Sequence, residues 1–183
     1  MISLHEVAGN ACVRFGASQD WGELAAALEV VAAINPEIIV EIGCDRGGTL
    51  YAWRQICERV YGITLADNSY GGGGSEEPLV DYGATVHLGD SHDPESLTWL
   101  SAQLDGAPID VLVLDGDHKR EGVLADLDTY GPLVRDGGLI LLHDIAVIGD
   151  QRAEVAQAWP EIKSQFERTV EIGKSYGWGI IYL

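Results

Sequence analysis

Short apolar segments alternate with segments of helical periodicity along this chain, and this alternation constrains the fold more than any other feature. The expected strands are apolar, often β-branched runs, at 38–43, 60–65, 84–89, 109–116 and 139–144. Apolar residues at helical spacing mark the expected helices, at 18–34, 47–57, 97–104, 123–130 and 155–166. Because neighbouring parallel strands need a long crossover, usually a helix, this order predicts a parallel sheet covered by helices on both faces.

The last two expected strands, 169–173 and 177–183, are separated by only three residues. A connection this short suits a hairpin and cannot hold a crossover, so the sheet should end in an antiparallel pair. A turn is expected at RDGG (135–138), just before the fifth strand. The chain is therefore predicted to be α/β, with a doubly wound mixed sheet of about seven strands. Ligands of such sheets bind outside the carboxyl ends of the strands.

Length and charge limit the class of protein. A chain of 183 residues predicts a single domain, in which 1–17 form an N-terminal extension. Its 11 Lys and Arg against 29 Asp and Glu give a net charge of −18, which argues against nucleic acid and anionic membranes as partners. No membrane span or signal peptide is expected. The widely spaced Cys12, Cys44 and Cys57 favour a reducing, cytoplasmic location.

The first expected strand leads into the glycine-rich sequence EIGCDRGGT (41–49). Glycines here permit a tight turn and the close approach of a ligand to the backbone. Gly43 is followed by three residues other than glycine, so the pattern is not GxGxxG and a pyrophosphate cradle is poorly supported. The acid at the strand end suits a cation better than a phosphate. A plain connecting turn is the alternative interpretation.

Carboxylates and imidazoles follow the fourth and fifth expected strands. The fourth ends in Asp115-Gly116-Asp117-His118 and the fifth in His143-Asp144. In a parallel sheet these ends can be neighbours, so Asp115 and Asp144 could hold a hard divalent cation, and His118 could act as a general base. A capping Asp or a surface His is the alternative for each residue alone. It explains the whole set less well, because clustered carboxylates repel one another.

Two other segments at this edge have open interpretations. Asp90 and Ser91 follow the third expected strand, where capping of the next helix is the simpler explanation. A Gly-rich loop at 66–78 follows the second strand, and a lid and a solvated loop are equally good interpretations of it.

The sequence also resembles a known family. EIGCDRGGT is similar to motif I of class I S-adenosylmethionine-dependent methyltransferases. The stretch LDGDHKREGVLADLDTYGPLVRDGGLILLHD (114–144) is similar to the small-molecule O-methyltransferase group that includes macrocin and mycinamicin sugar methyltransferases and cephalosporin hydroxylase-like proteins. Catechol-type methyltransferases are more distantly similar. The resemblance covers about residues 20–183 and implies a single methyltransferase domain with a Rossmann-like sheet and an antiparallel last strand.

The resemblance implies roles for the strand-end residues. Glu41, Gly43 and Gly47 would line the methionine end of S-adenosylmethionine. Further cofactor contacts would come from Asp90 and Ser91 near the adenine, and from Asp115 between cofactor and metal. The implied metal ligands, for Mg²⁺ or Mn²⁺, are Asp115, His143 and Asp144. His118 matches the position of a catalytic base, where catechol-type relatives have Lys.

Two positions depart from the family pattern. Relatives usually have an acid at the end of the second strand that grips the ribose hydroxyls, whereas Thr64 stands there in this chain and the next acid is Asp67. Either Asp67 reaches the ribose or the contact is weaker. Relatives also have two oxygen ligands at the metal pair, and His143 is not one. Mg²⁺ disfavours imidazole, which favours Mn²⁺ or no metal at all.

The sequence thus predicts an S-adenosylmethionine-dependent O-methyltransferase that acts on a hydroxyl of a small molecule, either a sugar or a natural product, with His118 as general base. One alternative is a non-catalytic binding or accessory protein that keeps the cofactor fold, which the two departures would fit. A nucleotide-dependent oxidoreductase is disfavoured by the missing GxGxxG. Relatives often form oligomers, and the N-terminal ISLHEVAGNACV (2–13) could pack against a second copy.

Overall fold

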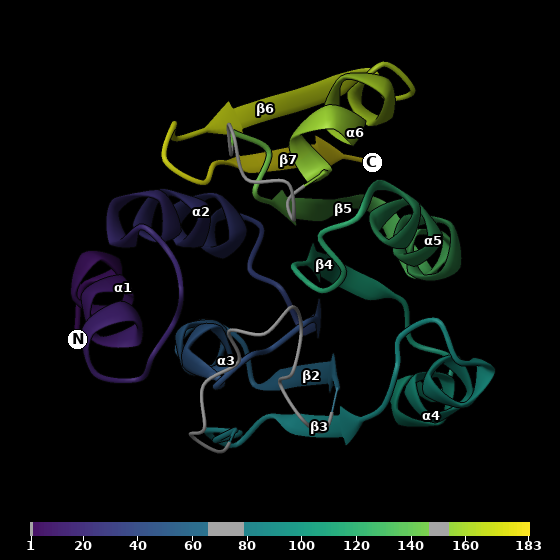
Figure 1. The fold of residues 1–183 in the computed structure, drawn as a ribbon. Coiled ribbons are helices and arrows are strands. Elements are labelled where there is room, and N and C mark those ends of the chain that lie inside the picture. The colour runs from purple at the N-terminus through teal and green to yellow at the C-terminus, as the bar shows by residue number, and fades with distance from the viewer. Residues whose placement is uncertain (1, 66–78, 147–153) are drawn as a thin grey trace.

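The computed structural model describes residues 2–65, 79–146 and 154–183, and within them seven strands form one sheet in the order β3-β2-β1-β4-β5-β7-β6 (Figure 1). The strands are β1 (Ile38–Ile42), β2 (Arg59–Thr64), β3 (Thr85–Leu88), β4 (Ile109–Leu114), β5 (Val134–His143), β6 (Arg168–Ile172) and β7 (Trp178–Tyr182). β1 to β5 pair in parallel, and β7 is antiparallel to both β5 and β6. The predicted mixed, doubly wound sheet is confirmed.

Helices cover both faces of the sheet, as the alternation predicts. One face carries α1 (Leu4–Val13), α2 (Trp21–Ala33) and α3 (Gly48–Arg54), and the other carries α4 (Pro94–Leu104), α5 (Arg120–Tyr130) and α6 (Val155–Lys163) (Figure 1). Successive residues of a strand face opposite sides of the sheet and pack into two different hydrophobic cores. The central strands are therefore buried on both faces, and their sequences are continuous apolar runs. Among the described helices, none is long and apolar enough to cross a membrane.

Two local features differ from the sequence-based expectations. α1 lies within the segment expected only as an N-terminal extension, and it begins with a capping box between Ser3 and Glu6, a signal that was present in the sequence. Residues 135–138, which were expected to form a turn, instead belong to β5. There the pairing of β5 with β4 is irregular, because Val134 pairs with Ile109 but Leu139 pairs with Val111.

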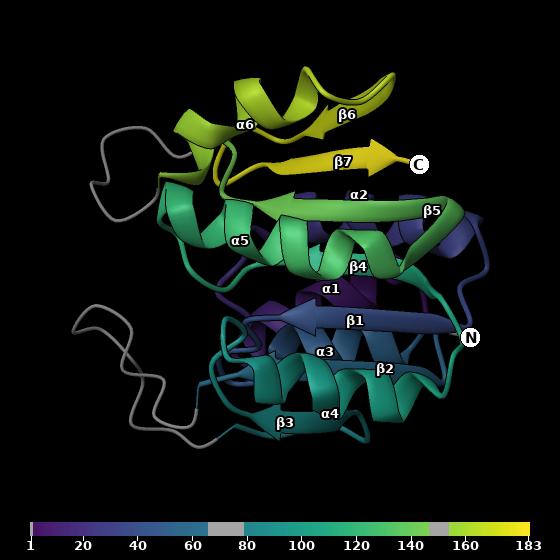
Figure 2. The ribbon, with the colours of Figure 1, turned by 90° about the vertical axis from the view of Figure 1, so that its right-hand side faces the viewer.

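The order in which successive strands are added to the sheet reverses direction between β1 and β4, which creates a topological switch point there. From this pair the sheet continues through β2 and β3 on one side and through β5 on the other. The arrowheads of β1, β3 and β5 point to the same side in Figure 2, and β7 points the opposite way. Ligands of doubly wound sheets bind at such a switch point, outside the carboxyl ends of the strands. This edge is therefore where functional side chains should lie.

Candidate active site

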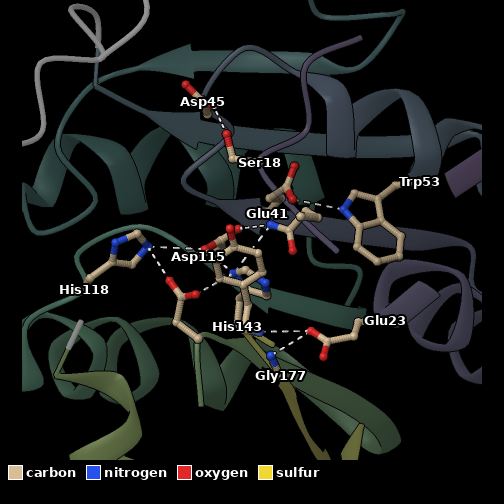
Figure 3. A network of polar contacts seen from close by, with 12 residues as sticks. Ser18, Glu23, Glu41, Asp45, Trp53, Asp115, His118, His143 and Gly177 are labelled. Carbon is tan, nitrogen blue, oxygen red and sulfur yellow. Dashed lines mark hydrogen bonds and ion pairs between the residues drawn. The ribbon is translucent and has the colours of Figure 1, made fainter. Parts of the chain in front are cut away.

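Four side chains form a closed ring at the ends of β4 and β5 (Figure 3). Asp115 Oδ1 lies 3.3 Å from His118 Nε2 and 3.1 Å from His143 Nδ1. Asp144 lies 3.3 Å from His118 Nε2 through Oδ2 and 3.4 Å from His143 Nδ1 through Oδ1. Each carboxylate thus contacts both imidazoles. We call Asp115, His118, His143 and Asp144 the four-residue cluster.

The register of the two strands explains this convergence. Leu114, the last residue of β4, pairs with Leu142, the residue before the end of β5. The residues that come next are therefore neighbours: Asp115 follows β4, and His143 is the last residue of β5. The final stretches of the two strands, Val111–Leu114 and Leu139–Leu142, are apolar and buried, so the polar side chains that follow them appear together where the strands end.

Mutual charge neutralisation stabilises the cluster. Burial acts to raise the pKa of Asp115, but His143 and His118 outweigh it and hold that pKa well below its usual value. Burial alone would lower the pKa of His118, yet Asp115 and Asp144 raise it to about 9. The same carboxylates raise the pKa of His143 against the effect of its burial. At neutral pH His118 is therefore largely protonated, and its positive charge beside Asp115 and Asp144 reduces the repulsion expected of clustered acids.

Asp144 adopts a backbone conformation that is rare for residues with a side chain. Its φ of 63° lies in the left-handed region. Such a conformation costs on the order of 1 kcal/mol and persists where surrounding contacts fix it. The two residues that follow supply such contacts, because Ala146 N–H donates to the carbonyl of Tyr176 over 2.7 Å and Ile145 N–H donates to that of Gly177 over 3.4 Å.

The segment before α2 contributes a residue that sequence reasoning missed. Gln19 Nε2 donates to Asp115 Oδ2 over 2.7 Å, and its neighbour Ser18 donates to Asp45 Oδ2 over 3.2 Å (Figure 3). Ser18 and Gln19 therefore connect the turn after β1 with the end of β4, across the switch point. Nothing in the sequence around Gln19 indicates this contact, because it joins positions 96 residues apart.

The glycines of the first turn are required by backbone packing. Gly43 has a φ of +86°, and a Cβ on it would collide with the backbone of Asp115 and Gly116. Gly47 has a φ of +88°, and a Cβ there would collide with the carbonyl oxygen of Val80. Both glycines thus let two chain segments approach each other closely at the edge where a cofactor is expected.

Glu41 lies inside the protein. Its side chain is completely buried between β1 and α3, where Oε1 accepts a hydrogen bond from Trp53 Nε1 over 3.0 Å. Burial raises the pKa of Glu41 to about 8, although hydrogen bonds from Trp53 and Thr49 act to lower it. The carboxyl group is therefore largely protonated at neutral pH.

The remaining expected cofactor residues lie on the far side of the switch point from the four-residue cluster. Thr64 ends β2 and is buried. Asp90 and Ser91 follow β3, where Asp90 Oδ1 accepts from the backbone N–H of His92 over 2.9 Å. The helix-capping interpretation of these two is wrong, because α4 begins at Pro94 with Asp93 as its N-cap. The whole predicted 66–78 loop, which includes Asp67, lies outside the described residues.

A doubly wound sheet with acidic and basic side chains beside its switch point defines the class of α/β proteins whose ligands bind at this edge. Residues 40–145, more than half of the chain, match the family model described as a methyltransferase domain. The chain belongs to this methyltransferase family, and the predicted resemblance is confirmed.

Curated relatives narrow the group. The chain is 34% identical to demethylmacrocin O-methyltransferase of Streptomyces fradiae over 101 residues, which cover 54% of this chain and 23% of that protein. It is 35% identical to 8-demethyl-8-alpha-L-rhamnosyl tetracenomycin-C 2'-O-methyltransferase of Streptomyces olivaceus over 116 residues, which cover 58% of this chain and 28% of that protein. The matched region thus spans about a quarter of the length of each curated relative.

A solved structure shares the fold. The MycE methyltransferase from the mycinamycin biosynthetic pathway, in complex with Mg, S-adenosylhomocysteine (SAH) and mycinamycin VI, aligns with a TM-score of 0.68 at 19% identity. The alignment covers 98% of this chain and 54% of that chain. The sheet of the present chain is therefore the sheet of known methyltransferases.

Proposed function

We propose that this chain transfers a methyl group from S-adenosylmethionine to a hydroxyl of a small-molecule natural product, with a sugar hydroxyl as the favoured acceptor. Family membership and the names of the two curated relatives support the reaction class and the acceptor class. The observation that carries the proposal is the four-residue cluster beside the β1–β4 switch point. It combines a candidate base with acids that can orient it at the edge where the fold binds ligands.

The edge suits a cofactor that carries a positive charge. S-adenosylmethionine supplies a methyl group already activated on a sulfonium, so the protein contributes mainly positioning and deprotonation. The proposed cofactor-binding residues are Glu41, Gly43, Gly47, Thr64, Asp67, Asp90, Ser91 and Asp115. Among them, Asp115 carries an ionised carboxylate, and its backbone lies directly against Gly43. An anionic group at this point favours a sulfonium over a phosphate.

The donor set also fits a divalent cation. Asp115, His118 and Asp144 each offer a ligand atom, and these atoms lie within 4.8 Å of one another. His143 Nδ1 faces the same two carboxylates. Two carboxylates with imidazole nitrogen suit Mn²⁺ better than Mg²⁺. Our proposal therefore keeps Asp115, His143 and Asp144 as metal ligands, with Mn²⁺ preferred, and leaves His118 for proton transfer. A bound cation would hold the acceptor oxygen and lower its pKa.

His118 is the proposed general base. Its Nε2 faces the cluster, and the side chain is about one-third exposed, so an acceptor hydroxyl can reach it. Asp115 and Asp144 accept from Nε2–H, orient the ring and stabilise the imidazolium that forms when Nδ1 takes the hydroxyl proton. Gln19 and His143 in turn hold Asp115 in place.

The sequence also supports proposals about the extent of the domain, the location of the protein and its oligomeric state. Residues 1–183 would act as one methyltransferase domain, with 1–17 as an extension and 66–78 as a loop at the ligand edge. The acidic chain would work in the cytoplasm, without nucleic acid or membrane partners, and a homo-oligomer would form through the N-terminal segment. The three cysteines, all without disulfide bonds, support a reducing location.

The test uses the full chain with S-adenosylmethionine and a panel of glycosylated and phenolic natural products, with and without Mn²⁺. We expect S-adenosylhomocysteine to be released with at least one acceptor, and calorimetry to detect binding of S-adenosylhomocysteine. His118→Ala should remove turnover while cofactor affinity stays within about twofold. Binding without turnover on any acceptor would favour the non-catalytic alternative, and no binding at high micromolar cofactor would refute the cofactor proposal.

A further inference from the structure

Glu23 lies outside the four-residue cluster, yet its carboxylate is saturated with hydrogen bonds. The residue sits in the first turn of α2 and is 7% exposed. Its Oε1 accepts from the backbone N–H groups of Lys174 over 2.6 Å and Ser175 over 2.7 Å. Its Oε2 accepts from those of Tyr176 over 3.2 Å and Gly177 over 2.9 Å. Four successive backbone donors therefore converge on one side chain.

The 173–177 loop, which joins β6 to β7, is shaped around this carboxylate. Successive N–H groups that point to one place form an anion-binding nest, and here the anion belongs to the protein itself. A Cβ on Gly173 would collide with the Glu23 side chain, so the loop and the carboxylate are closely packed. Burial acts to raise the pKa of Glu23, but the four hydrogen bonds outweigh it and hold the pKa below its usual value. Glu23 therefore stays ionised at neutral pH.

The 173–177 loop also contacts the residues that follow β5, although the loop contributes no residue to the four-residue cluster. The carbonyls of Tyr176 and Gly177 accept from the N–H groups of Ala146 and Ile145, the two residues after Asp144. The ring of Tyr176 also packs on His143, with a distance of 5.7 Å between ring centroids. Figure 3 shows the carboxylate of Glu23 pointing to the backbone N–H of Gly177. The loop is thus the connection between Glu23 and the segment in which Asp144 adopts its left-handed conformation.

The start of α2 also contacts both sides of the cluster. Gln19 reaches Asp115 at the end of β4, and Glu23 reaches the loop that contacts β5. Between them, Asp20 caps the helix through the N–H groups of Gly22 and Glu23 and accepts from Ser175 Oγ over 3.4 Å. One helix terminus therefore links β4 and the β6–β7 hairpin, which the sheet itself joins only through β5.

We propose that Glu23 is a positioning residue of the methyl-transfer site: its carboxylate fixes the 173–177 loop, and the loop holds Asp144 and His143 in the cluster. This role rests on the proposed function, because it assumes that the cluster is where the reaction occurs. Glu23 acts through the loop and touches neither cofactor nor acceptor. Its loss should therefore affect the acceptor side of the site and spare the cofactor side, whose proposed residues, apart from Asp115, belong to β1 to β3 and the segments that follow them.

The test compares Glu23→Gln with Glu29→Gln, an exposed glutamate on the same helix. The amide that replaces the carboxylate keeps the shape but turns an N–H₂ group toward two N–H donors. NMR amide hydrogen exchange reports each position without any need for activity. We expect exchange at Ser175 and Gly177, and also at Ile145 and Ala146, to quicken by about tenfold or more in Glu23→Gln and to stay unchanged in Glu29→Gln.

Kinetics then separate positioning from general loosening of the fold. Glu23→Gln should lower kcat by about tenfold or more, with the affinity for S-adenosylhomocysteine retained within about twofold. If Glu23→Gln does not fold, Glu23→Asp keeps the charge but shortens the reach, and its exchange should quicken at the same four amides.

Three outcomes have distinct meanings. Faster exchange at 174–177 without a change at Ile145 and Ala146 would overturn the proposal, since Glu23 would then only anchor a hairpin. Unchanged kcat in an active enzyme, despite faster exchange at all four amides, would overturn it as well. If the wild-type chain methylates no acceptor but the coupled exchange is found, the proposed function fails while the mechanical link from Glu23 to the end of β5 stands.

Discussion

Gln19 Nε2 donates a hydrogen bond of 2.7 Å to Asp115 Oδ2, while Oδ1 of the same carboxylate faces His118 and His143. Gln19, which precedes α2, thus occupies Oδ2 of Asp115 and leaves Oδ1 for the contacts within the cluster. Gln19 also approaches His143 Nδ1, at 3.5 Å. The hydrogen bond from Gln19 to Asp115 fixes the rotation of that carboxylate through the oxygen that its two imidazole partners do not use.

We therefore expect Gln19→Ala to disturb Asp115 without unfolding the sheet. Loss of one donor to a buried carboxylate costs about 1–3 kcal/mol of stability, and the freed Asp115 should lower kcat by about tenfold. Gln19→Glu should be worse, because it sets two carboxylates against each other. Chemical denaturation and steady-state kinetics measure these effects, with the exposed Gln55→Ala as control. Wild-type kinetics for Gln19→Glu would show that the contact has no catalytic consequence.

The pKa of His118 predicts a pH profile for methyl transfer. Asp115 and Asp144 raise this pKa to about 9 against the effect of burial, and only the neutral imidazole can accept a proton. With no cation added, kcat should rise with pH until about 9 and then level off. Stability follows the opposite course: the contribution of protonated His118 is fully present below the usual histidine pKa and is lost as pH rises through about 9.

The matched variant for this profile is His118→Asn, which keeps a polar side chain but removes the base. Its residual rate should be low and should lack the rise toward pH 9. A wild-type profile that levels off near pH 6.5, the usual histidine pKa, would contradict the assignment of His118 as a base strongly coupled to two carboxylates.

Removal of metal separates the two roles proposed for the cluster. After treatment with a chelator, we expect Mn²⁺ to restore more activity than Mg²⁺, because imidazole nitrogen accompanies the two carboxylates. Mn²⁺ affinity should fall as pH falls, since the cation competes with protons for His143 and its acidic neighbours. Asp115→Asn should weaken Mn²⁺ binding measured by calorimetry, whereas the exposed Asp128→Asn should not. Full activity in the chelated enzyme would refute a metal-assisted reaction.

Much of the fold could be predicted from the sequence because local pattern and topology agree. Apolar runs that end in polar residues identified the strands, and the three-residue gap before β7 predicted the antiparallel finish. The convergence of Asp115 with Asp144 followed from the rule that parallel strand ends meet at one edge. The helix α1 was not predicted because its small residues, such as Ala8 and Ala11, give a weak periodic signal. Its capping box, however, is present in the sequence.

The contacts that support the site could not be predicted in the same way. Gln19 meets Asp115 from 96 positions away, and Glu23 meets the backbone of Gly177 from 154 positions away. Neither residue type is unusual at the start of a helix, where acids are common in any case. Their partners are chosen by tertiary packing of α2 against the sheet, and a backbone N–H group leaves no trace in a sequence.

Glu41 provides a prediction about stability. Because burial raises its pKa to about 8, the folded chain holds a proton that the unfolded chain releases above about pH 4.5. The folded state therefore binds more protons across this window, and the contribution of Glu41 to stability falls as pH rises from about 4.5 to about 8. Its ionisation would leave a charge in the interior beside Trp53.

Glu41→Gln should remove this pH dependence. The amide cannot ionise, and its oxygen can still accept from Trp53 Nε1. Urea denaturation should then find the variant increasingly stable relative to wild type as pH rises from about 5 to about 8, by up to about 1.4 kcal/mol per pH unit. Glu58→Gln, on an exposed side chain, is the control. If the difference between Glu41→Gln and wild type does not change with pH, Glu41 titrates alike in the folded and unfolded chain, and burial does not raise its pKa.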